Sequence, residues 1–339
     1  MTPSDFAAFR SPSDGSALLL EDVMLRNGAV QAGALVAADG ERFAIRDGIA
    51  DLVWPRILDA RERAAIELYD ARADVYDQFL PLTFATFGED EAQVRQEMIA
   101  LLNLQPGQRV LEIGAGTGRD SEIIARALGP TGELHCQDIA QSMLVHNAAR
   151  LERQGLKASL SLANASHLPF PDDHFDAVFQ FGGVGEFSDV SGFFREVARV
   201  TRPGGRVVAG DESMPPWLRQ TEFARVLTFT NAQFAAPLPL EHLPIEAREV
   251  RLRWIIGGTF FLLDFSIGQG EPHADIDFPI PGPRGGTHRS RFHGQLDGVT
   301  PETKALAQQA RAKLGISMHD WLDGLVKREA RRILDGESG

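Results

Sequence analysis

Apolar and polar residues alternate with two different periods between residues 109 and 210. Short apolar runs of the kind found in buried strands are separated by segments whose apolar residues recur every three or four positions, as on one face of a helix. The predicted strands are 109–113, 133–137, 158–162, 175–181 and 206–210, and the helices between them include 119–128, 140–153 and 190–200. This alternation predicts a parallel sheet with helices on both faces.

Helical spacing also marks the segment upstream of this core. Apolar residues recur at helical intervals over 58–80 and again over 90–102, so both ranges are predicted helices. The two tyrosines of the chain, Tyr69 and Tyr76, are seven positions apart and therefore share one face of the first helix. The two tyrosines could therefore belong to an apolar stripe that packs against the core, or they could form a wall of a binding site.

The segment downstream of the core contains a predicted helix over 217–234 and two apolar runs, 247–256 and 259–267. Only Gly257 and Gly258 separate the runs, which is enough for an antiparallel hairpin and too short for a parallel crossover. We therefore expect a Rossmann-like, mostly parallel seven-stranded α/β sheet with an antiparallel last strand, plus a small N-terminal β module and a C-terminal helical tail.

Turn-forming dipeptides set the boundaries of the flanking modules. Asp-Gly and Asn-Gly pairs divide residues 1–55 into short β pieces, which predicts a small β module. The expected division is 1–55 for this module, 56–270 for the central domain (helical lead 56–105, core 106–215, helix and hairpin 216–270), and 271–339 for an arm and a two-helix tail.

The tail begins with a stretch rich in Gly and Pro, 268–298, that predicts a loop or an extended arm. Near its end, basic and apolar residues alternate as in a strand, at Arg289, Arg291, Phe292, His293 and Leu296. Thr300 predicts the start of a first helix and Gly315 its end. Ser317 with Asp320 predicts the capped start of a second helix.

Composition narrows the classes of protein to which this chain can belong. Among 339 residues, 34 Lys and Arg stand against 47 Asp and Glu, so the net charge of −13 disfavours broad contact with nucleic acid or anionic membranes. The single cysteine, Cys136, excludes an intrachain disulfide and a multi-thiolate zinc site. The longest apolar run, Trp254–Leu263, is too short for a membrane span, and no signal-peptide pattern opens the chain, so we expect a cytoplasmic protein.

A glycine-rich loop carries the clearest chemical signal. The predicted strand 109–113 runs directly into Gly114, Ala115, Gly116 and Gly118, and a predicted helix follows. Three glycines allow a tight turn and let the backbone approach a ligand without interference from Cβ atoms. A nucleotide-like cofactor is therefore expected here, against the alternative of a loop that only turns tightly.

Two acidic residues near this loop indicate the cofactor. The spacing is G-x-G-x-G and not the dinucleotide form G-x-G-x-x-G, and the Glu112 carboxylate would repel a pyrophosphate. It suits a ligand that carries an ammonium and a sulfonium group, such as S-adenosylmethionine (SAM). Asp138 ends the second predicted strand, where a carboxylate accepts hydrogen bonds from the ribose hydroxyls of SAM and NAD alike. SAM is the predicted cofactor, with NAD as the alternative.

Four segments, in order along the chain, resemble the class I SAM-dependent methyltransferase family, in particular its ubiquinone/menaquinone-biosynthesis-like branch. They are 110–119, 138–144, 168–178 and 195–205. The resemblance implies a sheet with a reversed seventh strand, which the predicted hairpin would supply. It also implies that Glu112 faces the methionyl amine, that Asp138, with Ile139 beside it, binds the ribose, and that the residues after the third strand hold the adenine.

The adenine end departs from the family pattern. Asn164, in Ala163-Asn164-Ala165, stands where the family often has aspartate. Its side-chain carbonyl can still accept a hydrogen bond from the adenine amino group, and Ala165 would line the same end. The alternative for Asn164 is a turn residue without contact to the cofactor.

Methyl transfer needs alignment, exclusion of water and, for some nucleophiles, a general base. Candidates lie after the fourth and fifth predicted strands, because open α/β sheets bind ligands at the carboxyl ends of their strands. Phe181 would line the site, and Glu186, near where relatives often carry histidine, is the predicted base, with a solvated loop carboxylate as the alternative. Tyr69 and Tyr76 would cover the methionine end, where aromatic faces stabilise a sulfonium.

Both flanking modules resemble known small folds. Residues 11–52 resemble a zinc-ribbon module, but Ser11, Asp14, Val36 and Asp39 occupy the cysteine positions, so no metal site is expected there. The strand and two helices of the tail resemble a ribbon-helix-helix module, for which dimerisation or packing, a substrate-side lid and DNA binding stay open. The histidines and aspartates of the tail lack ligand spacing, so no metal is predicted there either.

These observations predict an enzyme that transfers a methyl group from SAM to a small-molecule acceptor with an oxygen or carbon nucleophile, by in-line displacement. The alternatives are an RNA methyltransferase and a SAM-binding regulator with a dimerising or DNA-binding tail. The net charge disfavours a nucleic-acid partner, and a homodimer formed through the tail stays open. The sequence does not identify the acceptor.

Overall fold

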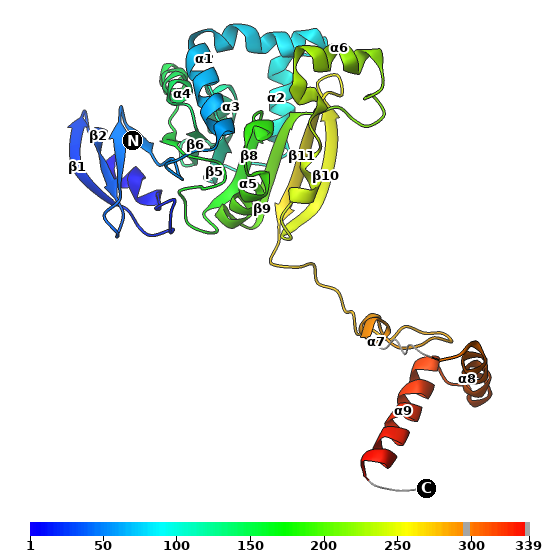
Figure 1. Ribbon diagram of the computed structural model, residues 1–339. Helices are drawn as coiled ribbons and strands as arrows, with labels where there is room; N and C mark the ends of the chain where they lie inside the picture. Colours follow the sequence, from blue (N-terminus) through cyan, green and yellow to red (C-terminus); the bar gives the residue numbers. More distant parts are fainter. Residues whose placement is uncertain (294–298, 336–339) are drawn as a thin grey trace. The chain divides into compact units, whose positions relative to one another are not determined.

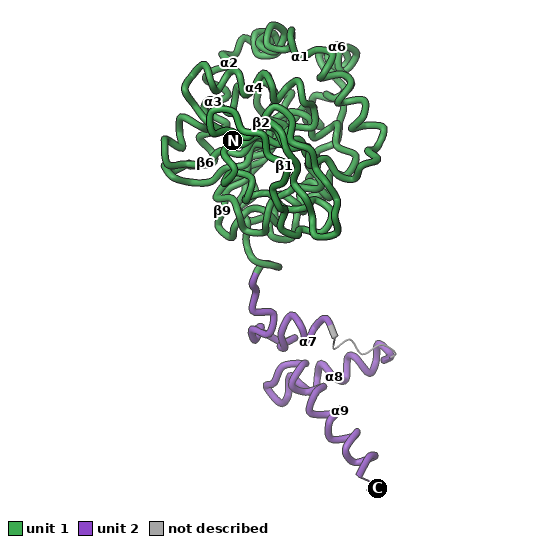
Figure 2. The backbone as a smooth tube through the Cα atoms, turned by 90° about the vertical axis from the view of Figure 1, so that its left-hand side faces the viewer, with its two compact units in different colours: residues 1–272 green, residues 273–339 purple. Residues whose placement is uncertain are grey.

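The computed structural model describes residues 1–293 and 299–335. The chain divides into two compact units, residues 1–272 and 273–339, which Figure 2 colours separately. The first unit contains both the central α/β region and the N-terminal β strands.

One mixed sheet organises the first unit (Figure 1). Its eleven strands, within the described residues, follow the order β1-β2-β3-β4-β7-β6-β5-β8-β9-β11-β10. Their bounds are β1 Leu19–Arg26, β2 Ala29–Val36, β3 Arg42–Arg46, β4 Ile49–Asp51, β5 Arg109–Ile113, β6 Glu133–Asp138, β7 Ser159–Leu162, β8 Phe175–Phe181, β9 Thr201–Glu212, β10 Ala247–Ile255 and β11 Phe260–Ile267. Seven of these strands, β5 to β11, belong to the central region, and the four N-terminal strands, which were expected to form a separate module, join the same sheet through β4.

The five central strands are parallel, as the strand–helix alternation predicts. β5 and β8 have the predicted bounds, whereas β9 begins five residues before the predicted 206 because it continues through a register shift opposite β8. β6 and β7 lie on one side of β5, and β8 and β9 lie on the other. The direction of the connections therefore changes between β5 and β8, where open α/β sheets form their ligand crevice.

Helices cover both faces of this parallel region. They are α1 Ala60–Thr86, α2 Glu91–Ala100, α3 Arg119–Leu128, α4 Gln141–Arg153, α5 Val190–Val200 and α6 Glu222–Thr230, with 3₁₀ turns η1 Pro3–Ala8, η2 Val184–Glu186, η3 Ala232–Ala235 and η4 Pro239–His242. α3 and α5 have the predicted bounds. α1 continues past Pro81, beyond the predicted end at 80, because Phe84 is buried in a cluster with Met214 and Phe260.

The hairpin at the end of the central domain has the predicted direction. β10 pairs with β11 antiparallel, and β11 pairs with β9 antiparallel. Apolar residues of β11 face both ways: Phe265 packs in the cluster that contains Phe194 of α5, and Leu262 packs in the cluster that contains Ile99 of α2. The core of the unit therefore consists of one apolar layer on each face of the sheet.

The N-terminal β segment extends the central sheet. β1 to β4 pair antiparallel with one another, and β4 pairs with β7 parallel, with Ala50 opposite Ser161. Phe6 and Phe9 are buried and share a cluster with Phe170 of the central region. Packing against the sheet edge thus holds this segment in place.

The second unit contains α7 His288–His293, α8 Pro301–Leu314 and α9 Met318–Leu334. The strand predicted over Arg289 to Leu296 was wrong for its first half, which is α7, and Leu296 lies outside the described residues. The two later helices are confirmed with their caps, because the side chains of Thr300 and Ser317 accept from backbone N–H groups and Gly315 has a left-handed φ of 67°.

Candidate active site

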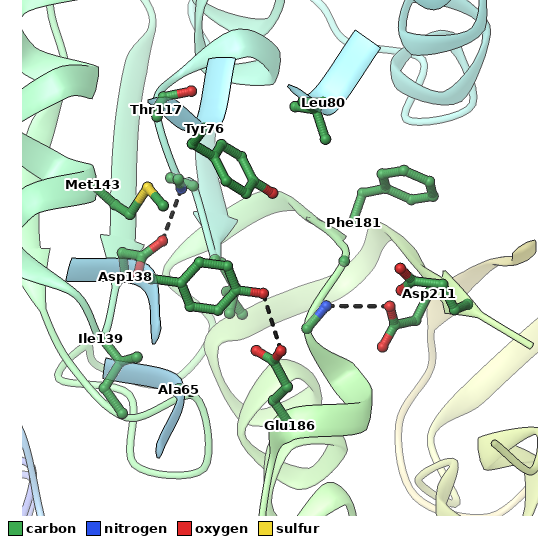
Figure 3. A pocket seen from close by; sticks show the side chains of 18 of the residues that line it. Ala65, Tyr76, Leu80, Thr117, Asp138, Ile139, Met143, Phe181, Glu186 and Asp211 are labelled. Atoms are coloured by element: carbon green, nitrogen blue, oxygen red, sulfur yellow. Dashed lines mark hydrogen bonds between the residues drawn. The ribbon is translucent and has the colours of Figure 1, made fainter. Parts of the chain in front are cut away.

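A cavity of about 560 Å³ lies at the carboxyl ends of β5, β6, β8 and β9, with α1 along one side (Figure 3). Its size is typical of pockets that hold cofactors and small substrates. Every candidate site residue except Glu112 and Gly118 lines it, namely Tyr69, Tyr76, Gly114, Ala115, Gly116, Asp138, Ile139, Asn164, Ala165, Phe181 and Glu186. The fold thus brings together residues separated by more than a hundred positions.

The glycine loop supplies the floor of the cavity. Gly114 has a φ of 66° and Gly116 a φ of 51°, and a Cβ atom on Gly116 would meet open space. Gly118 has another role: it caps α3, and its Cβ would lie 2.8 Å from the Asn147 side chain of α4. Glycine is favoured at 118 by the left-handed φ of 84° and by the close approach of α4.

Asp138 holds this loop in shape from the end of β6. Its carboxylate is 8% exposed and accepts the N–H groups of Gly116 at 2.8 Å and Ala140 at 2.9 Å. Burial raises its pKa above the ordinary value, although these N–H donors oppose the shift. A carboxylate has about four acceptor positions, so about two stay available to hydroxyl donors in the cavity.

Glu112 does not line the cavity, in contrast to its expected position beside the methionyl amine. Its carboxylate is 2% exposed and lies behind the loop, where it accepts the Ser121 hydroxyl at 2.5 Å and the Cys136 thiol at 3.5 Å. Burial raises its pKa to about 8, and the nearby charge of Asp120 adds to the shift. Glu112 therefore belongs to the packing between β5, β6 and α3.

Asn164 lines the cavity as a turn residue. Its side-chain carbonyl accepts both the N–H and the hydroxyl of Ser166, at 3.1 and 2.9 Å. Both acceptor positions of that oxygen are therefore in use. Acceptance from an adenine amino group, as expected from the sequence, does not fit this geometry, and the side-chain amide N–H is the group left to face a ligand.

The wall of the same cavity also combines a tyrosine with carboxylates. The Tyr69 hydroxyl donates to Glu186 Oε1 at 3.1 Å, and the Tyr69 and Tyr76 rings meet edge to face with centroids 6.0 Å apart. The Asp211 carboxylate accepts the N–H groups of Gly183 and Gly185 at 3.2 and 2.6 Å, which fixes the turn that carries Glu186 (Figure 3).

The pKa shifts of Glu186, Tyr69 and Tyr76 separate the roles of these groups. Burial raises the pKa of Glu186, although the hydrogen bond from Tyr69 opposes the shift. Burial also raises the pKa of Tyr76 to about 12 and that of Tyr69 further, so both phenols stay protonated near neutral pH. Among these three groups, Glu186 is the carboxyl group and therefore the one that can act as a proton acceptor.

Three aspartates of α1 fasten that helix over the cavity, and the sequence analysis does not single them out. Asp70 accepts the Ser142 hydroxyl at 2.5 Å, and Asp74 lies 3.0 Å from His146 Nε2. Asp77 binds Arg150, Arg119 and the Thr117 hydroxyl. Their spacing of four and three residues places them on one face of α1, opposite α4 residues at intervals of four. That matched spacing is the signal that could have found them.

Replacing Asp77 with alanine is expected to loosen α1, because it removes contacts with both α4 and the start of α3. Backbone amides of residues 60–86 should then exchange with solvent faster than in the wild type, while amides of β5 and β8 keep their protection. Hydrogen exchange measured by mass spectrometry gives both values. Equal exchange rates of α1 in the variant and the wild type would contradict the fastening role.

The structure also bears on two other classes of site. Within residues 1–293 and 299–335, no group of three or more His, Cys, Asp and Glu side chains is arranged to hold a metal ion. No helix in the same part of the chain has the length and apolar character that crossing a bilayer requires.

Residues 110–205 match the family described as "Methyltransferase domain". This match covers the glycine loop, Asp138 and the strands β5 to β8, together with α5. The mixed α/β sheet and the family match define a class I SAM-dependent methyltransferase domain. It is an enzyme domain, and its cofactor is SAM.

The particular relatives are C-methyltransferases. A protein of Cupriavidus metallidurans named ubiquinone/menaquinone biosynthesis C-methyltransferase UbiE is 37% identical over 131 residues, which is 39% of this chain and 54% of that protein. A protein of the same name from Burkholderia cenocepacia is 42% identical over 110 residues, 32% of this chain and 45% of that protein. The chain spans about half the length of the curated relatives it matches.

Two solved structures are similar to part of this chain. A SAM-dependent methyltransferase from Aquifex aeolicus is similar over 52% of this chain and 94% of that one, with 19% identity and a TM-score of 0.38. Phosphoethanolamine N-methyltransferase 2 of Haemonchus contortus, in complex with SAM, is similar over 59% of this chain and 60% of that one, with 12% identity and a TM-score of 0.46.

Proposed function

We propose that this chain methylates a small-molecule acceptor at an oxygen or carbon nucleophile with SAM as the donor. The observation that carries the proposal is the cavity itself, which is lined by Asp138, the glycine loop and the hydrogen-bonded pair Tyr69–Glu186. The relatives named C-methyltransferases support a small acceptor. A net charge of −13 disfavours RNA as the acceptor.

The residues at the loop end fit SAM. The free acceptor positions of Asp138 suit the two ribose hydroxyls, and the open space above Gly116 admits a ligand close to the backbone. The Asn164 amide N–H would donate to a ring nitrogen of the adenine, with Ile139 and Ala165 along the same wall. SAM supplies a methyl group on a positively charged sulfur, ready for in-line displacement.

At the acceptor end, the chain aligns the nucleophile and accepts its proton. Glu186 would take the proton from a hydroxyl or an acidic C–H group, with Tyr69 and the Asp211-bound turn as positioning groups. The apolar side chains of Phe181, Ile256 and Phe260 line this region and exclude water from the nucleophile.

Transfer from SAM with a labelled methyl group tests the proposal. A metabolite extract should yield labelled small products, and total RNA should not. Glu186→Gln should lower the transfer rate about 100-fold, because a general base contributes at least that much, while SAM affinity stays near that of the wild type. Transfer to RNA alone, or SAM binding without any transfer, would overturn the proposal in favour of an RNA methyltransferase or a regulator.

Two assignments outside the cavity stay part of the proposal. We place the protein in the cytoplasm, and we assign the tail to a homodimer contact, because α8 and α9 contain no buried residue and expose apolar side chains such as Leu306 and Leu325. Light scattering of the full chain and of a variant truncated after residue 272 measures their molecular masses and so tests the homodimer contact.

A further inference from the structure

The acceptor's part of the cavity can be located from the sheet. Asp138 ends β6 and Glu212 ends β9, and the order β6-β5-β8-β9 separates them by three strand spacings, about 14 Å. A second cavity of about 530 Å³, between the start of α1 and η3, shares Glu186, Asn231 and Gln233 with the first. Glu212 therefore lies well beyond the ribose position, and Glu186 lies where the two cavities adjoin.

Three carboxyl groups that line the first cavity have little to compensate their charge. Glu62 is 4% exposed; its Oε1 accepts the N–H and hydroxyl of Ser188, and its buried Oε2 has no hydrogen-bond partner among the described residues. Glu186 has the Tyr69 hydroxyl, and Glu212 has the Asn231 amide at 3.4 Å. None of these partners carries a positive charge.

The positive side chains that line the cavity are engaged elsewhere or lie at its exposed rim. Within the described residues they are three arginines and no lysine. Arg95 pairs with Glu91 and Asp120, and Arg119 pairs with Asp77 and Glu91. Arg72 lies on the exposed surface of α1. Removing carboxylates from water without a counter-charge is costly, so the cavity is built for a ligand that brings one.

The walls of the cavity are partly aromatic. Phe84, Phe181, Phe260 and the two tyrosines line it, and the Phe181 and Phe260 rings lie with centroids 5.7 Å apart. The Arg95 guanidinium already makes a cation–π contact with this wall, because it lies 5.4 Å from the centroid of the Phe84 ring. Aromatic faces beside carboxylates are a favourable setting for an ammonium group and an unfavourable one for an anion.

We infer that the methyl acceptor carries a positive charge, such as an ammonium group, which Glu62 and Glu212 bind while Glu186 serves the reacting atom. This inference rests on the proposed function and adds the charge class of the acceptor. Burial raises the pKa of Glu212 to about 9, and Asp211 adds to the shift, as happens where a carboxyl group has no counter-charge.

Ion exchange of the products tests the inference with the full chain. A metabolite extract is separated at pH 7 into cationic, neutral and anionic fractions, and each is incubated with the protein and labelled SAM. The label should appear in products of the cationic fraction. Products confined to the neutral or anionic fraction would overturn the inference while the proposed function stands. Absence of transfer from every fraction would count against the proposed function itself, and so against both.

Matched variants identify the carboxyl groups responsible. Glu212→Gln and Glu62→Gln should each raise the KM for the labelled acceptor, once purified from the cationic fraction, about tenfold, the loss expected for one charge-assisted hydrogen bond, with SAM affinity close to that of the wild type. Glu222→Gln, the same change on the exposed start of α6, should leave both values unaltered. Weaker SAM binding with an unchanged KM would assign these carboxylates to the sulfonium and overturn the inference.

Discussion

Replacing Asp138 with alanine is expected to weaken SAM binding at least about tenfold, because one charge-assisted hydrogen bond contributes about 1.5–3 kcal/mol and two ribose hydroxyls are affected. The variant also releases the N–H groups of Gly116 and Ala140, so the glycine loop loses the contacts that hold it in its bent form. Calorimetric titration of the purified chain with SAM measures the change.

The control for this variant lies on the same strand. Glu133 is exposed at the other end of β6, and Glu133→Ala removes a carboxylate without touching the cavity. Its SAM affinity should match that of the wild type. Circular dichroism and the thermal midpoint show whether each variant is folded. A folded Asp138→Ala protein that binds SAM as the wild type does would refute the position of the ribose.

A second large effect is expected from Glu112 in the dependence of stability on pH. Burial raises its folded-state pKa to about 8, above an unfolded value near 4.5. The folded state therefore keeps a proton that the unfolded state releases, so this carboxyl group lowers the free energy of unfolding as the pH rises from about 4.5 to about 8. The loss is at most about 1.4 kcal/mol per pH unit.

Glu112→Gln removes this titration and keeps an acceptor for Ser121. Between pH 6 and pH 8, the wild type should lose about 2–3 kcal/mol relative to this variant. Urea unfolding at both pH values measures the difference, and Glu133→Gln serves as the control. Parallel stability curves for Glu112→Gln and the wild type would show that Glu112 is already ionised in the folded state. SAM affinity should change little, because Glu112 does not line the cavity.

Much of the central fold is predictable from local patterns. β5, β8, α3 and α5 have the bounds that apolar periodicity predicts, because each buries a continuous apolar face and ends at a turn or a capping residue. The direction of the β10–β11 hairpin follows from its short turn. The caps of α8 and α9 likewise depend only on neighbours within the same few residues.

The failed expectations concern contacts between distant segments. The position of Glu112 behind the loop depends on which face of β5 packs against α3, and the role of Gly118 depends on how closely Asn147 of α4 approaches. The eleven-stranded sheet required β4 to pair with β7, more than a hundred residues later. The local sequence of these segments does not show which distant segments they pack against or pair with.

The sequence by itself determined the parallel α/β core, the glycine loop, the acidic end of β6 and the helical ends, because each depends on residues only a few positions apart. The tertiary structure decided which side chains face the cavity, how α1 is fastened above it, and that Glu62, Glu186 and Glu212 line the same cavity. The physical reason is that burial and charge compensation are properties of the assembled surroundings, and segments far apart in the chain supply those surroundings.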